Sequence, residues 1–273
     1  MRNTFIAMMC TVVLVLPVAA QQRVDETRQV AADAVVTFEG VSGTVVVSGW
    51  DRAEVRVTGT LGRRIEKLEI TGSDQRLDLR VVYPRNCHDC GDADLELKVP
   101  AGCRFEAETV SADLELGGVR GEVWLKSVSG RVRVAAGGSL RAKTVSGPLV
   151  IRGAGRAVNA TTVSGALSAD VAVLEDGEFE TVSGDIEIDT DLAPKARLEV
   201  KTVSGSVELR VPASVGADFE IESFSGRIRN QFGQQARRSS KYGPGYELLF
   251  ARGDGSARVF IKTLSGSVRL LEK

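Results

Sequence analysis

The sequence has little of the residue types on which many enzymes depend. Aromatic residues make up 5% of the 273 residues, and His88 is the single histidine. A Ser–His–Asp hydrolase would have to use this histidine, which lies between two cysteines in a polar loop, so the sequence argues against that class. No glycine loop of the phosphate-binding type precedes a helical pattern, and nucleotide binding therefore has no support.

An excess of charge of one sign is also missing. The chain has 35 Lys and Arg against 36 Asp and Glu, a formal net charge of −1, and the two signs are interspersed. A protein that binds nucleic acid usually carries a basic stripe that follows the phosphates. We therefore expect no nucleic-acid partner.

A long apolar run occurs only at the N-terminus. Arg2 is followed by an apolar stretch from Phe5 to Val18, and Val18-Ala19-Ala20 has the small residues of a cleavage site. The stretch is too short to be a comfortable membrane span. We predict that residues 1–20 are a signal peptide cleaved near Ala20, and that the mature chain is periplasmic or extracellular with no transmembrane segment. The alternative is an N-terminal membrane anchor that stays uncleaved.

Three cysteines remain after such a cleavage: Cys87, Cys90 and Cys103. In an oxidising compartment we expect one disulfide and one remaining thiol. A Cys87–Cys90 loop is possible but tight, and Cys103 could pair with either. A redox pair and a zinc site that includes His88 are the alternatives. A second C-x-x-C is absent, and adjacent Cys and His rarely bind one tetrahedral ion, so we predict no metal and no cofactor.

What the sequence does have is a repeated phrase, Thr202-Val203-Ser204-Gly205. The serines of successive copies are 17 to 21 residues apart, except for a last step of 40, which we interpret as two repeats with one copy lost. A period near twenty with strand patterning predicts a parallel β-solenoid, a single-stranded β-helix. The corners of its rungs are Ser129, Gly130, Ser146, Gly147, Ser164, Gly165, Ser183, Gly184, Ser204, Gly205, Ser225, Gly226, Ser265 and Gly266.

The residues around each corner alternate with period two. In the copy at Ser129, Val123 and Leu125 precede the corner and Val132 and Val134 follow it. This predicts a five-residue strand, a kink at Ser-Gly and a second strand of about four residues, with apolar residues inside. The glycine would permit the bend, the serine would bond to nearby backbone, and the threonines would form a stacked row of hydroxyls.

One position of the phrase conflicts with this alternation. If Thr202 shares the inward side of Val200, then Val203 should point outward, yet this position is Val, Leu or Phe in every copy. Either the kink resets the alternation, or a row of apolar side chains lies exposed along one edge. We favour the reset. An exposed row would mark an interaction site.

The chain divides by pattern into residues 1–20, an N-terminal β region and cap at 21–104, and a repeat region with a C-terminal hairpin cap at 105–273. Residues 30–273 are expected to be one continuous domain. Lys67–Pro84 has the pattern of a hairpin. Residues 246–250 and 257–263 are expected to form the terminal hairpin, joined through Gly253-Asp254-Gly255.

The repeated phrase, behind a signal peptide, is similar to that of a known family. Together with Val41-Ser42-Gly43-Thr44-Val45-Val46-Val47, which leads into Gly49-Trp50-Asp51, it resembles the DUF4097 group of "putative adhesin" β-strand repeat proteins. The resemblance covers about residues 30–272. It implies a parallel β-solenoid on an exported bacterial protein and supplies no catalytic or ligand-binding residues.

Two short motifs could carry chemistry. Asp185, Glu187 and Asp189 would share one outward row, where carboxylates could bind calcium or act on a sugar, although a solvated strand face explains them as well. Arg252-Gly253-Asp254 spells an integrin-type tripeptide, but a hairpin turn demands the same residues. Nearby, Arg237, Arg238 and Lys241 form a small basic cluster.

We therefore predict an exported, non-enzymatic solenoid that acts as a cell-envelope scaffold or an adhesin-like binding surface, with an unknown protein or glycan as its partner. The alternative is a carbohydrate-active β-helix enzyme, a lyase or hydrolase. A local site is expected where the phrase fails, around Cys87–Cys103 and in residues 231–256.

Overall fold

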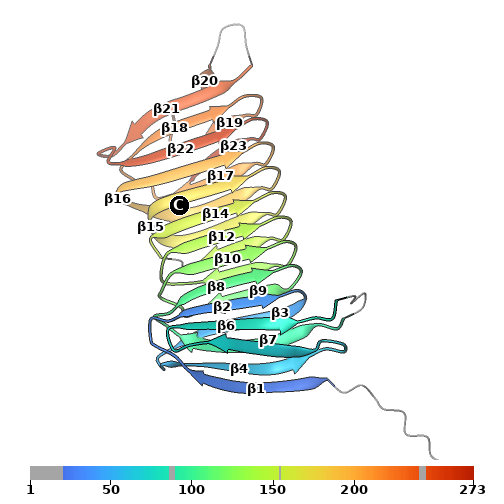
Figure 1. Cartoon of the computed structure of the whole chain (residues 1–273). Coiled ribbons are helices and arrows are strands. Elements are labelled where there is room, and N and C mark those ends of the chain that lie inside the picture. The colour runs from blue at the N-terminus through green and yellow to red at the C-terminus, as the bar shows by residue number, and fades with distance from the viewer. Residues whose placement is uncertain (1–20, 86–89, 154, 240–243) are drawn as a thin grey trace, which may run out of the picture.

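The structure is a computed structural model that describes residues 21–85, 90–153, 155–239 and 244–273. Within these ranges it is built of strands and turns, and none of these residues forms a helix that could cross a membrane. The strands belong to one hydrogen-bonded sheet that stacks from β1 at one end to β20 at the other (Figure 1). The predicted parallel β-solenoid is confirmed.

Each central rung has one strand on a first face and one on a second face, joined at the Ser-Gly corner. Equivalent positions stack in parallel register, so that Leu125 lies between Ala107 and Ala142. The first-face strands are β8 (Arg104–Thr109), β10 (Val123–Ser127), β12 (Leu140–Thr144) and β14 (Ala157–Thr162). The second-face strands are β9 (Asp113–Gly117), β11 (Val132–Ala135), β13 (Leu149–Arg152) and β17 (Val207–Val211). The long strands β15 (Leu167–Thr181) and β16 (Ile186–Thr202) run from the second face of one rung to the first face of the next.

The interior is the one that the period-two pattern predicts. The apolar residues that flank each corner, from Val123 and Leu125 to Val268 and Leu270, are at most 3% exposed. Each inward position stacks on apolar residues in the rungs on either side, and removal of this surface from water stabilises the stack by about 25 cal/mol per Å². The dry core therefore runs through the whole stack of rungs.

The corner glycines are needed for a different reason from the expected bend. None of the seven, from Gly130 to Gly266, has a positive φ. Instead they stack in a column, and a Cβ on any of them would lie 1.7–2.2 Å from the carbonyl oxygen of the neighbouring rung. Glycine is required because the backbones of adjacent rungs come too close for a side chain.

The N-terminal end is closed by antiparallel strands. On the second face, β3 (Gly43–Trp50) is followed outward by β7 (Ala93–Pro100), β4 (Glu54–Leu61) and β1 (Gln22–Gln29). On the first face, β2 (Val35–Gly40) is followed by the predicted hairpin of β6 (Arg76–Val82) and β5 (Lys67–Gly72). Strand β1 could not be predicted from alternation, because Val24 is its one buried residue.

At the other end the order of the rungs departs from the order of the chain. The rung of β22 (Ala257–Thr263) and β23 (Val268–Glu272) lies between β16 and β17 on one side and β18 (Ala217–Ser223) and β19 (Ile228–Asn230) on the other. The C-terminus therefore lies partway along the stack (Figure 1). The step of 40 residues comes from this return of the chain, and the interpretation as a lost copy is wrong.

The C-terminal end is closed by β21 (Tyr246–Arg252), which runs antiparallel to β18 and pairs with the short β20 (Arg237–Arg238). The expected pairing of residues 246–250 with 257–263 is wrong, because β18 lies between them. Phe219, Phe232 and Phe250 pack together here, with the rings of Phe219 and Phe250 4.6 Å apart and nearly parallel. This aromatic cluster seals the end of the core.

Candidate functional site: an exposed aliphatic ladder and a polar hollow

A row of apolar side chains is exposed along the corner of the solenoid. Each member is the second residue of a repeat phrase, and each is 40–53% exposed. The preference for an inward valine is therefore wrong. We call this row the ladder; in stacking order it consists of Val41, Val110, Val128, Val145, Val163, Val182, Val203, Leu264 and Phe224.

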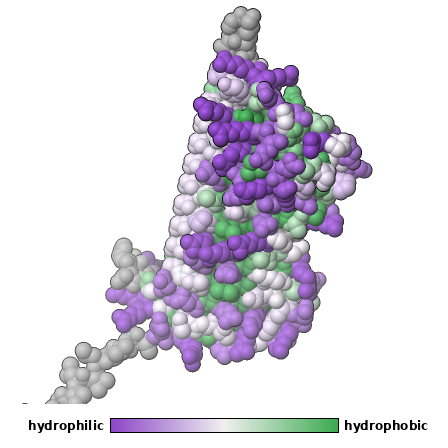
Figure 2. All heavy atoms as spheres, turned by 180° about the vertical axis from the view of Figure 1, so that it is seen from behind, coloured by the Kyte–Doolittle hydropathy of each residue, from purple (hydrophilic) through white to green (hydrophobic). Residues whose placement is uncertain are grey.

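The geometry of the corner explains why the ladder points outward. Thr202 is buried, Val203 and Ser204 are both exposed, and Gly205 is buried again. The alternation does change at the corner, but it does so by adding the serine as a second outward residue, which leaves the valine outside. Seen from behind, this edge of the stack is a regular column of near-neutral residues (Figure 2).

The serines hold successive ladder residues together. The backbone N–H of Ser204 donates to the carbonyl oxygen of Val182 at 2.9 Å, and its Oγ donates to the same oxygen at 3.2 Å. The same pair of bonds recurs at the other motif serines, from Ser111 to Ser265. The spacing of the ladder is thereby fixed by the backbone and does not depend on contacts among the apolar side chains.

A trough runs along the ladder. One part, of about 550 Å³, lies beside Val41 to Val145, and a second, of about 600 Å³, lies beside Val182 to Phe224. Its floor is a stacked row of Thr and Ser hydroxyls, in which Thr144 and Thr162 are 3.0 Å apart. The motif glycine donates its N–H to this floor, as Gly205 does to Thr202 at 3.0 Å.

Charged side chains form the wall of the trough opposite the ladder. Lys126 pairs with Glu108 at 2.5 Å and Lys262 with Glu222 at 2.8 Å. The hydrogen bond to Glu108 raises the pKa of Lys126. The wall is therefore nearly neutral, with most positive charges matched by a carboxylate of the next rung.

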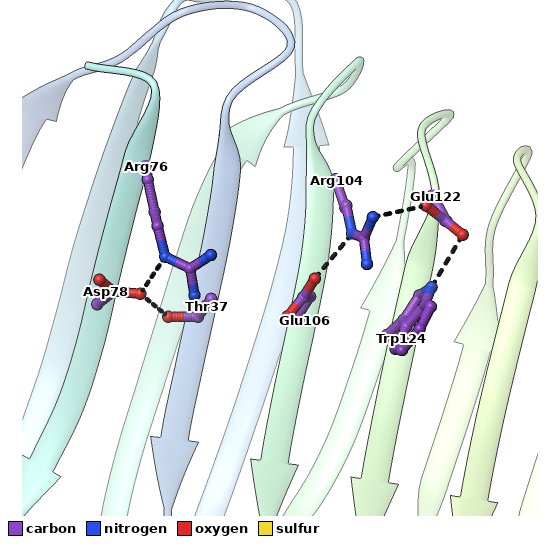
Figure 3. Close-up of polar contacts among 7 residues, drawn as sticks. All are labelled: Thr37, Arg76, Asp78, Arg104, Glu106, Glu122 and Trp124. Atoms are coloured by element: carbon purple, nitrogen blue, oxygen red, sulfur yellow. Dashed lines mark hydrogen bonds and ion pairs between the residues drawn. The ribbon is translucent and has the colours of Figure 1, made fainter. Parts of the chain in front are cut away.

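A second concave surface, which we call the N-terminal hollow, lies on the outer side of the first face. It has a volume of about 900 Å³ and spans β5, β6, β2, β8, β10 and β12. Figure 3 shows part of its polar network, in which Thr37 donates to Asp78 at 2.5 Å. Arg104 bridges Glu106 at 2.7 Å and Glu122 at 3.2 Å, and the indole N–H of Trp124 donates to Glu122 at 2.9 Å. The sequence gave no hint of this hollow, because its members come from strands far apart in the chain.

The structure limits the expected cysteine chemistry. Cys103 is a free thiol with no exposed surface, and burial raises its pKa to about 12. The possible disulfide to Cys103 is therefore absent. Cys87, with His88, lies outside the described residues, so a Cys87–Cys90 disulfide stays a prediction, as does the rejected zinc alternative.

The acidic row is engaged in contacts within the solenoid. Asp185 accepts a hydrogen bond from the backbone N–H of Ser206 at 2.8 Å. Glu187 pairs with Arg210 at 2.9 Å, and Asp189 pairs with Lys273 at 2.7 Å. These contacts support the solvated strand face that the sequence also allowed.

The integrin-type tripeptide is also engaged internally. Arg252 donates to the carbonyl oxygen of Ala213 at 2.9 Å and lies 5.1 Å from the ring centre of Phe232. Asp254 accepts from the N–H of Ser256 at 3.2 Å, as in a turn. In the basic cluster, Arg237 pairs with Glu247 at 3.0 Å, whereas Lys241 lies outside the described residues.

Fold and surface together define a parallel β-solenoid with an apolar edge. The model of the Toastrack DUF4097 family matches residues 34–271, and the chain belongs to this family. The resemblance found in the sequence is thereby confirmed. A comparison with curated protein sequences returned no match.

Several solved structures are similar to the chain. One, described as a "putative lipid binding protein" from Parabacteroides distasonis ATCC 8503, is 14% identical, with 92% of this chain and 97% of that one covered and a TM-score of 0.47. A "putative adhesin" from the same strain is 13% identical, with 93% and 98% covered and a TM-score of 0.42. Another, from Bacteroides fragilis NCTC 9343, is 11% identical, with 93% and 99% covered and a TM-score of 0.39. We take no ligand or partner from them.

Proposed function

We propose that this chain is an exported, non-enzymatic scaffold of the bacterial cell envelope with an adhesin-like binding surface, and that its ladder docks a partner protein. The observation that carries the proposal is the ladder itself. Its nine positions are all apolar although all nine are exposed, and the serine bonds already fix the corner without them.

The size of the ladder fits a protein partner. Nine side chains that are each about half exposed present apolar surface on the order of 600 Å², the upper end of the largest patch on a typical monomer. With the trough beside it, the surface approaches the roughly 800 Å² that each partner contributes to a stable interface.

The chemistry of the ladder also favours protein over glycan or membrane. Aliphatic side chains offer no hydrogen bonds to sugar hydroxyls, and the charged wall beside them is nearly neutral, so it would not attract an anionic bilayer. A protein with its own apolar ridge meets both conditions, because its ridge covers the ladder while its polar groups reach the trough.

The test compares two triple variants of the mature chain. Val145→Thr, Val163→Thr and Val182→Thr keep the β-branched shape at the centre of the ladder while adding a hydroxyl. Val46→Thr, Val150→Thr and Val173→Thr make the same change at outward valines off the ladder. Co-sedimentation with envelope fractions of the producing cell, followed by cross-linking and identification of the bound protein, measures docking.

We expect the ladder variant to lose envelope binding by about tenfold or more, because three central contacts of about 0.5–1 kcal/mol each are weakened. The control variant should bind like the unmodified chain. Equal binding by all three proteins would refute docking through the ladder. Depolymerisation of any polysaccharide by the unmodified chain would show instead that the non-enzymatic part of the proposal is wrong.

A further inference from the structure

The N-terminal hollow differs from the trough in the chemistry of its floor. The inward residues beneath it, such as Phe38 and Leu125, are buried, so the floor consists of the outward side chains of the first face. One row of these crosses five strands in register: Thr37, Glu106, Trp124, Arg141 and Asn159. The floor is thus a line of hydrogen-bonding groups with one aromatic ring.

Every carboxylate that lines the hollow already has a cationic partner. Asp78 pairs with Arg76 at 3.2 Å. The other pairs are Glu39 with Arg80, Glu69 with Lys67, Glu106 with Arg104 and Glu108 with Lys126. The negative charges of the hollow are therefore neutralised before any ligand arrives.

Two cations of the hollow have no such partner. Arg141 and Lys143 are exposed neighbours on one face of β12, and neither has a carboxylate within 4.0 Å among the described residues. Alternate residues of a strand are about 7 Å apart, so both can reach one anionic group. The guanidinium of Arg141 lies 4.4 Å from the ring centre of Trp124, and this stacking holds its fork of N–H donors in place.

Trp124 is itself fixed. Its N–H is bonded to Glu122, and a second guanidinium, that of Arg104, lies 4.8 Å from the ring centre. Since guanidiniums already stack on the indole, the ring serves to orient Arg141 and is not an open platform for a sugar ring. The anion site is therefore preorganised by the β10 side chain beside it.

The dimensions of the hollow select the ligand class. Five strands at about 4.8 Å spacing give a polar row about 19 Å long, which suits a short chain of sugar units better than a single small anion. A volume of about 900 Å³ lies within the usual range for a ligand site. A hydroxyl-rich chain satisfies the hydrogen-bonding floor, and an acidic peptide would leave much of that floor unpaired.

We infer that the N-terminal hollow binds an acidic oligosaccharide, with a sugar carboxylate held by Arg141 and Lys143. This site rests on the proposed binding function, but it uses a surface other than the ladder. Failure of the one does not imply failure of the other, because ladder-dependent attachment to the envelope is measured separately.

The probes are tetragalacturonate and its methyl ester, which differ in charge but not in sugar chain, together with hexaglutamate as an acidic peptide. The proteins are the mature chain, the double variant Arg141→Ala/Lys143→Ala, and Arg133→Ala. Arg133 is a matched control, since it is an exposed arginine on the second face with no carboxylate within 4.0 Å among the described residues. Calorimetry measures affinity, and Trp124 emission supplies a second readout.

We expect tetragalacturonate to bind, and its affinity to fall about tenfold or more on esterification or in the double variant, because hydrogen bonds to charged groups contribute most of the selectivity. Arg133→Ala should bind like the unmodified chain. Equal affinity of the double variant overturns the inference. So does tighter binding of hexaglutamate, or no binding of oligosaccharides from pectate, alginate and hyaluronan by a chain whose circular dichroism shows it to be folded.

Discussion

The column of glycines gives a prediction that is sharp enough to refute the account of the corner. In Gly184→Ala the new Cβ would lie 1.9 Å from the carbonyl oxygen of Gly165 and 3.1 Å from Oγ1 of Thr181, whereas ordinary contacts begin at 3.4 Å. The two rungs would have to separate by more than an ångström. That separation would break the bonds from Gly184 to Thr181 and from Ser183 to Val163, each now 2.9 Å.

The magnitude follows from three terms. Two lost hydrogen bonds cost about 1 kcal/mol each, and overpacking in a rigid stack costs a further 1–3 kcal/mol or so. The lower entropy of the unfolded chain with alanine offsets about 0.5 kcal/mol. We therefore expect Gly184→Ala to lower the free energy of unfolding by about 3 kcal/mol.

Gly117→Ala is the matched control. Gly117 also ends a strand of a rung, its φ is not positive, and a Cβ there would meet nothing within 4 Å. It should leave the protein unchanged or stabilise it by about 0.5 kcal/mol. Urea unfolding followed by far-ultraviolet circular dichroism measures both variants, with a shifted midpoint at constant slope as the readout. Equal midpoints for the two variants would show that rung spacing does not require the glycine.

Three further outcomes follow from buried and paired groups. Thr109 and Thr181 are both 5% exposed, but the Thr109 hydroxyl has no hydrogen-bond partner among the described residues, whereas Thr181 accepts from Gly184. Thr109→Val should therefore stabilise the fold by about 1 kcal/mol and Thr181→Val destabilise it by about 1–2 kcal/mol, and the same sign for both in urea unfolding would contradict this. Cys103, whose pKa burial raises to about 12, should resist alkylation in the native chain and react only after unfolding, as peptide mass spectrometry can show. Hydrogen bonds, first from Lys201 and then from Arg197, lower the pKa of Glu199 from 4.5; its contribution to stability is present above that value and lost as the pH falls through the lower folded pKa, so Glu199→Gln should flatten the acid side of the stability profile.

The repeat and its interior could be predicted from the sequence because they depend on local periodicity. Alternation around each corner places residues such as Leu125 and Val132 inside, and stacking of equal rungs follows. The ladder could have been predicted from the same alternation. Carried through Thr202, it points Val203 outward, and the preference for a buried valine came from its hydrophobicity alone.

Other features depend on contacts that no local pattern encodes. The hollow joins Thr37 on β2 to Arg141 on β12, and only the parallel register brings these strands together. The position of β22 between β16 and β18 likewise depends on which edges remain unpaired when the chain turns back. A step of 40 residues fits a lost copy and a returning chain equally well, so spacing could not decide between them.

The returning rung also sets the order in which the solenoid can be completed. Strands β16 and β18 emerge from the ribosome some forty residues before β22, and both must keep an edge open for it. Because Thr202-Val203-Ser204-Gly205 and Ser223-Phe224-Ser225-Gly226 share one corner pattern, these two strands can pair directly with each other in the meantime. The nascent chain thus carries its own competitor to the native register, and folding ends with an insertion between existing rungs, a contact of long sequence separation and therefore a slow one.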